Sequence, residues 1–221
     1  MPYLSPQGRI EVTTAPAAEP ISTADAKAWL RIPSAASEDD ALIDALVTTA
    51  RVWVEEYTQR KLITQTVTQY LDALPGYNSE AEMPSEGRIS DYLAGASRWI
   101  ELIANPVQSI TSFTTYTDDD TATAWASSNY RLSSAGDRAR LVPVGSASWP
   151  TYTRTSDGIV IVYVAGYGNA GSDIPDAILQ AMKLMIAHWY ENREAVVTGV
   201  AAQDVPLTVK ALLAPYRYVS I

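Results

Sequence analysis

The spacing of hydrophobic residues changes twice along the chain and divides it into helical and extended regions. Between Leu42 and Tyr57, apolar residues recur at the i, i+3, i+4, i+7 spacing of a helix with one buried face. From about Leu62 to Ala165 the pattern is that of short strands separated by turn residues. Helical spacing returns after Asp173, and a last amphipathic piece covers residues 207–214. With a further short helix before Pro33, the pattern predicts two helices, a run of strands and two further helices.

Short motifs predict where the helices begin. Residues 22–25 have the spacing of a capping box, and the short helix that follows stops at Pro33. Residues 37–40 repeat the motif and are expected to open the long helix, with acidic groups at the positive end of its dipole. Asp173 is the expected cap of the third helix, with Pro175 in its first turn.

No helical pattern separates the predicted strands, which favours an antiparallel arrangement. We therefore predict an α+β fold, in which the N- and C-terminal helices form one bundle and an antiparallel β sheet or small sandwich is inserted between them. The bundle is expected from residues 21–62 and 173–221, and the β region from residues 63–172. Residues 1–20 are rich in proline and predict an extended N-terminal arm with little regular structure. The predicted strands are residues 63–71, 98–103, 109–117, 130–132, 140–142 and 159–164, and the long turn-rich linker is residues 78–97.

Composition narrows the range of partners. The formal net charge is −9, which disfavours sequence-independent binding of nucleic acid, although negative walls around a conduit let DNA slide without sticking. The chain contains no cysteine, so disulfides and thiolate metal sites are excluded. Its first residues lack the pattern of a signal peptide, and no window has the length and hydrophobicity of a membrane span. These features predict a protein that is made in a cytoplasm and does not enter a membrane.

One motif suggests nucleotide chemistry. Gly166, Gly168 and Gly171 form a G-x-G-x-x-G sequence between a predicted strand and a helix, as in a dinucleotide-binding fingerprint. However, the helix cannot start at Gly171, and no strand follows to complete a βαβ unit. A plain turn between a strand and a helix is therefore the favoured interpretation.

Other candidates for catalysis or metal binding are weaker. His188 is the single histidine, and it lies near the edge of the apolar stripe of its helix, where a half-buried packing role is favoured. One histidine without cysteine makes a zinc site improbable. Asp118, Asp119 and Asp120 lack the pattern of a calcium loop and are expected at a solvated hairpin tip. We expect no enzyme activity, cofactor or metal.

Several sequence segments resemble one protein family in their order and spacing. They begin with residues 22–31 and 39–43, followed by ARVWVEEYTQRKLITQT at residues 50–66. IELIANPVQSI at 100–110 comes next, then residues 129–132, 140–143 and 149–150. AGYG at 165–168, IPDAI at 174–178, YENRE at 190–194 and LLAPYR at 212–217 complete the set. Together they resemble the head–tail connector, or adaptor, family of long-tailed bacteriophages and of related prophage and gene-transfer particles.

The resemblance implies a structural virion protein of the neck, assembled in the bacterial host cytoplasm. Such connectors form a ring of about twelve subunits under the portal protein, which requires two different patches on each subunit. The ring joins the capsid to the tail, continues the DNA channel without binding DNA specifically and meets a downstream stopper or tail protein. The alternatives are another neck or tail component, such as a stopper or tail terminator, and an enzyme built around the three glycines.

The resemblance also implies that a terminal segment contacts the portal. We expect Leu212, Leu213, Tyr216 and Tyr218 to be the anchors and Arg217 the polar contact, because Tyr and Arg are enriched where interfaces bind most tightly. The alternative for Leu212 and Leu213 is that they complete the helical bundle. In a ring, the Asp118–Asp119–Asp120 tip would face the channel or a partner.

Overall fold

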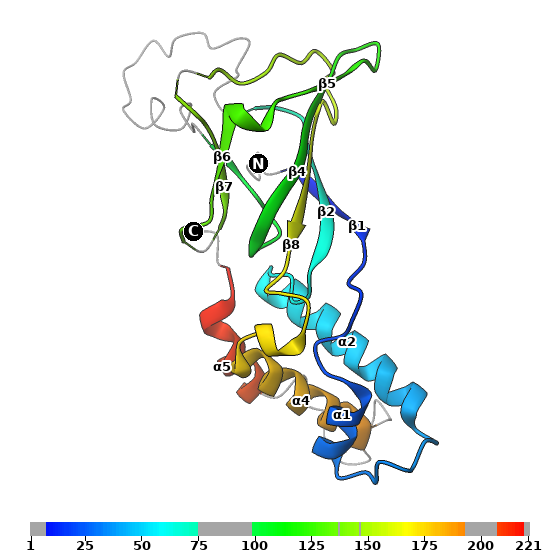
Figure 1. Cartoon of the computed structure of the whole chain (residues 1–221). Helices are drawn as coiled ribbons and strands as arrows, with labels where there is room; N and C mark the ends of the chain where they lie inside the picture. Colours follow the sequence, from blue (N-terminus) through cyan, green and yellow to red (C-terminus); the bar gives the residue numbers. More distant parts are fainter. Residues whose placement is uncertain (1–7, 75–98, 137, 146, 193–206, 219–221) are drawn as a thin grey trace, which may run out of the picture. The chain divides into compact units, whose positions relative to one another are not determined.

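The structure is a computed structural model that describes residues 8–74, 99–136, 138–145, 147–192 and 207–218 (Figure 1). The chain divides into two compact units. The β unit comprises Met1–Ala15 and Gln65–Ala165, and the helical unit comprises Pro16–Thr64 and Gly166–Ile221. The predicted linker at 78–97, residues 1–7 of the predicted arm, residues 193 and 194 of the YENRE motif, and residues 219–221 lie outside the described residues.

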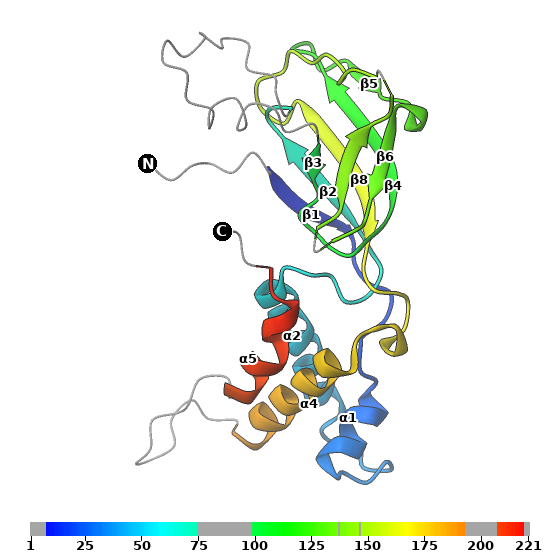
Figure 2. The ribbon, with the colours of Figure 1, turned by 90° about the vertical axis from the view of Figure 1, so that its left-hand side faces the viewer.

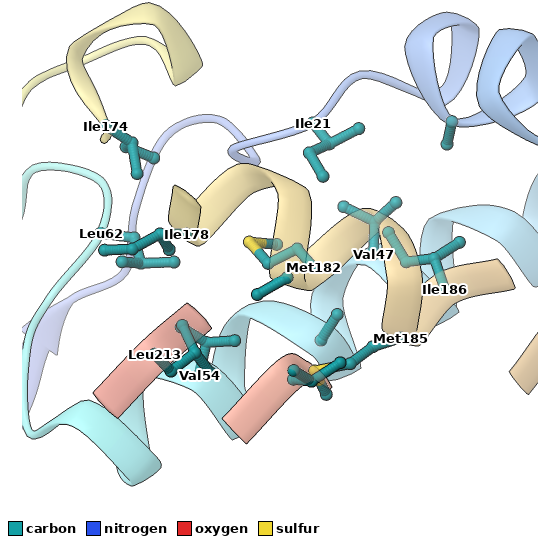
Figure 3. Close-up of a cluster of buried hydrophobic side chains, with 14 of the residues drawn as sticks. Ile21, Val47, Val54, Leu62, Ile174, Ile178, Met182, Met185, Ile186 and Leu213 are labelled. Atoms are coloured by element: carbon teal, nitrogen blue, oxygen red, sulfur yellow. The ribbon is translucent and has the colours of Figure 1, made fainter. Parts of the chain in front are cut away.

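The helical unit contains the four helices that the hydrophobic spacing predicts. Apolar side chains from α2, α4 and α5 converge between the helices, as Figure 3 shows, and the most central of them are fully buried. Val47 and Val54 of α2, Met182 and Ile186 of α4 and Leu213 of α5 all belong to this cluster, and Figure 3 labels them. The helices are α1 (Thr23–Leu30), α2 (Asp40–Thr58), α4 (Asp176–Glu191) and α5 (Leu207–Leu213), with short 3-10 turns at Gly171–Asp173 and Ala214–Tyr216.

Two of the predicted helix starts are wrong in detail. Ser22 caps α1 as expected, because its hydroxyl accepts the backbone N–H of Asp25 at 3.1 Å. The long helix instead begins at Asp40 after Asp39, without a side-chain cap, because both carboxylates bind elsewhere. Asp40 accepts from the Lys27 ammonium at 2.8 Å, and Asp39 accepts from the Tyr190 hydroxyl. Tertiary contacts therefore replace the local cap.

The start of α4 differs in a similar way. Pro175 is the N-cap residue and precedes the first helical turn, which begins at Asp176. Asp173 belongs to the preceding 3-10 turn, where its carboxylate accepts the backbone N–H of Ala170 at 3.0 Å. The acidic residue thus closes the turn before the helix and does not cap the helix itself.

The β unit is a small sandwich of two antiparallel sheets around its own core (Figure 2). Val67 of β2, Phe113 of β4, Leu141 of β7 and Ile161 of β8 are buried between the sheets. The larger sheet has the order β1-β2-β8-β4-β5, with strands Arg9–Thr14, Gln65–Leu71, Ile159–Ala165, Val107–Tyr116 and Ala122–Ala124. The smaller sheet has the order β3-β7-β6, with strands Ile100–Glu101, Arg140–Pro143 and Tyr130–Ser133. The α+β fold with an antiparallel sandwich is confirmed.

The N-terminal segment does not fit the predicted arm of little regular structure. Arg9–Thr14 pairs with β2 in register from Arg9 opposite Tyr70 to Val12 opposite Val67. Both α1 and α2 therefore lie between two strands of one sheet in the chain order. The alternation of Ile10 and Val12 with polar residues is the sequence signal for this strand.

A buried polar network joins the two sheets of the β unit. The Tyr163 hydroxyl accepts the backbone N–H of Ala104 at 3.0 Å and donates to Gln69 Oε1 at 3.2 Å. The Gln69 amide also donates to the Glu101 carbonyl at 3.0 Å and accepts from the N–H of Ile103 at 3.1 Å. Burial raises the pKa of Tyr163, which keeps its hydroxyl a neutral donor. Gln69 and Tyr163 thereby hold the β3 segment over β2 and β8.

Candidate functional site

The turn after α2 is organised by one buried carboxylate. The side chain of Glu55 is 4% exposed, and its Oε1 accepts the backbone N–H of Leu62 at 3.0 Å. Its Oε2 lies 3.2 Å from Lys61 Nζ and 3.7 Å from Arg51 Nη1. Gln59 ends the helix in a left-handed conformation, with φ of 58°. Residues 55–62, within the sequence motif at 50–66, thus form the end of α2 and the turn that follows it.

The C-terminal segment is fastened to this same helix end. Arg60 Nε donates to the Tyr216 carbonyl at 2.7 Å, and the N–H of Tyr218 donates to the Thr58 carbonyl at 3.2 Å. Leu213 is fully buried in the bundle core, and Leu212 and Tyr216 pack partly buried against it. The structure therefore brings the end of α2 and the expected partner-binding segment together.

An aromatic stack continues from α2 onto the C-terminal segment. The rings of Trp53 and Tyr57, one helical turn apart, are nearly parallel, with centroids 5.0 Å apart. The guanidinium of Arg217 lies over the Tyr57 ring, with its Cζ 5.1 Å from the centroid. Arg217 is exposed, whereas Tyr57 and Tyr218 are half-buried. The stack therefore holds the Arg217 guanidinium at the surface, next to Tyr57 and Tyr218.

The three glycines of the G-x-G-x-x-G sequence are sites of close chain packing. A Cβ added to Gly166 would lie 2.6 Å from the carbonyl of Ile63, and the residue has a φ of 134°. A Cβ on Gly168 would meet the Asp173 carboxylate at 2.2 Å, and one on Gly171 would meet the Pro20 carbonyl at 2.1 Å. The space beside each glycine is filled by the chain itself, and the turn after Gly166 pairs with the α2 exit through Thr64 N to Gly168 O at 2.9 Å.

The three aspartates lie in the turn between β4 and β5. The carboxylate of Asp119 accepts hydrogen bonds from the hydroxyl of Thr117 and from the N–H of Thr121, and these bonds lower its pKa. Asp120, 78% exposed, lies 3.3 Å from Arg154 Nη1. The turn therefore presents negative charge on a loop whose conformation is held by these hydrogen bonds and by the ion pair.

The remaining candidates show no arrangement typical of catalysis. His188 is half-buried on α4, and its backbone carbonyl accepts from the Asn192 amide at 2.8 Å. A cleft of about 380 Å³ in the helical unit contains Asp25 and Lys183, and Asp25 is engaged with the α1 cap. Within the described ranges, no group of three or more acidic or histidine side chains is placed to hold a metal ion, and no helix has the length and hydrophobicity to cross a membrane.

Fold and contacts together define an α+β protein with a helical bundle and a small antiparallel sandwich, in which the motif residues are engaged in packing. Comparison with known families gives a match to the phage gp6-like head-tail connector protein family over residues 21–99. The resemblance stated from the sequence is thereby confirmed for the segment that carries α1, α2 and β2. No curated protein matches the chain significantly.

Three solved structures share the fold over nearly the whole chain. A chain in the neck of an empty gene transfer agent particle, computed with C6 symmetry, aligns with a TM-score of 0.75 at 21% identity and covers 96% of this chain and 97% of that one. A chain in the virion of the native particle gives 0.73 at 23% identity, with 96% of each chain covered. A chain in the native neck computed with C12 symmetry gives 0.68 at 22% identity, covering 96% and 97%.

Replacing Glu55 tests the turn after α2. We expect Glu55→Ala to lower the free energy of unfolding by about 3 kcal/mol, because it leaves the Leu62 N–H and two cations without their shared buried acceptor. Glu56→Ala, at the exposed neighbouring position, should change it by less than about 0.5 kcal/mol. Urea unfolding of both variants measures the difference, and equal effects would contradict the role of Glu55.

Replacing Gly166 tests the packing interpretation of the glycine turn. Gly166→Ala should destabilise the protein by about 2 kcal/mol more than Gly145→Ala, because both glycines have positive φ but a methyl group at Gly145 meets open space. Thermal unfolding compares the two variants. A dinucleotide that stabilised the wild type and failed to stabilise Gly166→Ala would instead favour a binding site.

Proposed function

We propose that this protein is a structural component of the neck of a phage-like particle, where it joins the capsid to the tail and continues the DNA channel. The observation that carries the proposal is the combination of the connector family match at residues 21–99 with a fold shared over 96% of the chain with neck proteins. The sites described above add no arrangement of catalytic groups that would favour an enzyme built on Gly166, Gly168 and Gly171.

The protein acts as a ring of about twelve copies. Related necks have been computed with C6 and C12 symmetry, and a rotational ring of one protein matches such symmetry. The particle is a phage, a prophage-derived particle or a gene transfer agent, and assembly takes place in the bacterial host cytoplasm. A stopper or tail terminator is the second candidate, and the family match favours the connector over it.

The C-terminal segment is the surface we assign to the portal protein. Leu212, Tyr216, Arg217 and Tyr218 lie at or near the surface of the helical unit, and Leu213 supports them from the core. The stack under Arg217 orients its guanidinium, so less freedom is lost when it binds a carboxylate of the partner. Tyrosine beside arginine is a combination enriched among residues that dominate binding energy.

The acidic tip is assigned to the channel or to the next neck or tail protein. Asp118, Asp119 and Asp120 add to a net charge of −9, and negative walls release no counterions from passing DNA. DNA then moves past the ring without specific binding.

Quantitative mass spectrometry of purified particles tests the neck assignment. We expect this chain at a copy number close to that of the portal protein, because both would form rings in a single vertex. Absence of the chain from mature particles, in preparations where the portal protein is detected, would overturn the proposal.

Arg217→Ala tests the portal surface. We expect binding to the portal protein to weaken about tenfold or more, since an oriented guanidinium at an interface centre contributes strongly. Arg131→Ala, which removes an exposed arginine of β6, should leave binding unchanged. Binding is measured by calorimetry with purified portal rings, and unchanged melting temperatures show that both variants fold. Equal affinities of the two variants would contradict the assignment.

A further inference from the structure

The larger sheet of the β unit extends one strand beyond the smaller sheet. β3 lies over β2, because the Gln69 amide bonds to the carbonyl of Glu101 and the N–H of Ile103. On the far side, Tyr130 of β6 lies against Phe113 of β4, with ring centroids 6.1 Å apart. In the described part of the chain, no strand of the smaller sheet follows β3, so none faces β1. All six residues of β1 are exposed.

The side of β1 that lacks a cover is the apolar side. Residues opposite each other in register point to the same face of a sheet. Ile10 is opposite Gln69 and Val12 is opposite Val67, and both β2 residues are fully buried. Ile10 and Val12 therefore continue the core-facing side of the sheet, yet they are 37% and 40% exposed.

The other face of β1 already has partners. Arg9 lies over the Tyr70 ring, with its Cζ 4.6 Å from the centroid, and the Tyr70 hydroxyl donates to Glu11 at 3.2 Å. The hydroxyls of Thr13 and Thr68 are hydrogen-bonded. The two apolar side chains are thus the part of β1 that a further binding partner would cover.

The outer edge of β1 is also open to pairing. β1 is the end strand of its sheet, and within the described ranges no strand pairs with its outer edge. Proteins protect such an edge with charged side chains, proline or bulges. The sequence RIEVTT contains no lysine or proline, and its charged residues Arg9 and Glu11 lie on the other face of the sheet, against Tyr70. A bulge between Val12 and Thr14 leaves Arg9–Val12 as a regular stretch of edge. Backbone groups in this arrangement bind another extended segment.

We propose that Ile10, Val12 and the outer edge of β1, together the β1 margin, form one side of the contact between neighbouring copies of this chain in the ring. This inference rests on the proposed function. An edge that stays open, as it does within the described ranges, favours uncontrolled association unless every copy receives a partner segment. A ring of identical subunits supplies one such segment per copy, through the heterologous contact that rotational symmetry requires. The occupant is an extended segment of the adjacent copy.

A photo-crosslinker at Val12 tests the occupant directly. The amino acid p-benzoylphenylalanine replaces Val12 in producing cells, and purified particles are irradiated. We expect an adduct of twice the chain mass whose crosslinked peptides both come from this sequence, and no such adduct from the monomeric protein at the same concentration. An adduct with a different particle protein would overturn the proposal and identify that protein as the occupant.

A charge substitution provides the second test. The double variant Ile10→Lys, Val12→Lys should enter particles at least about tenfold less than wild type, because lysine at an edge blocks strand addition while remaining solvated in the free subunit. Val144→Lys is the matched control, since Val144 is another apolar residue of the β unit, 36% exposed, that lies outside the β1 margin. Circular dichroism and melting temperature establish that both variants fold.

The outcomes separate the two levels of the proposal. If wild-type chain is absent from particles, the neck function itself fails. If wild-type chain is present at the copy number of the portal protein, but the double variant enters equally well and Val12 gives no adduct with another copy, the β1 margin alone is wrong.

Discussion

The buried carboxylate of Glu55 is the interaction on which the organisation of the helical unit depends. It lies in the last turn of α2, accepts the N–H of Leu62 and pairs with both Arg51 and Lys61. These contacts fix the turn after α2. In this turn, Arg60 donates to the Tyr216 carbonyl and so holds the C-terminal segment. A buried charge is stable only when it is paired and hydrogen-bonded, so these positions constrain one another.

The same region connects packing to the proposed role in a particle. A surface that docks on a ring works best when its side chains are held in place before binding, because less conformational freedom is then lost. On the helical unit, the stack of Trp53 and Tyr57 holds the Arg217 guanidinium in place in this way. The β unit differs, because the contact proposed at the β1 margin uses backbone groups and two exposed apolar side chains. A ring subunit that binds both the portal protein and its neighbouring copies, as we propose, needs two chemically different surfaces.

The glycine turn illustrates why a motif needs its structural context. A nucleotide-binding loop leaves space beside its glycines so that a pyrophosphate can approach the backbone. Here, the positions beside Gly166, Gly168 and Gly171 are filled by Ile63, Asp173 and Pro20. The absence of side chains at these three positions serves the close approach of two chain segments, which is the other use of glycine.

Periodicity alone determined the helices, most strands and the α+β class, because apolar spacing reports directly which face of an element is buried. Sequence motifs that resemble the head–tail connector family, such as residues 50–66, indicated the proposed role. Local caps were predicted less well: Asp39 and Asp40 bind Tyr190 and Lys27, residues whose proximity follows only from the packed bundle. The strand at Arg9–Thr14 was missed because its alternation is short and prolines surround it, and it forms through pairing with β2, more than fifty residues away. Sequence therefore determined what each segment buries, whereas the tertiary structure decided which distant groups satisfy its polar atoms and which edge of the sheet stays open.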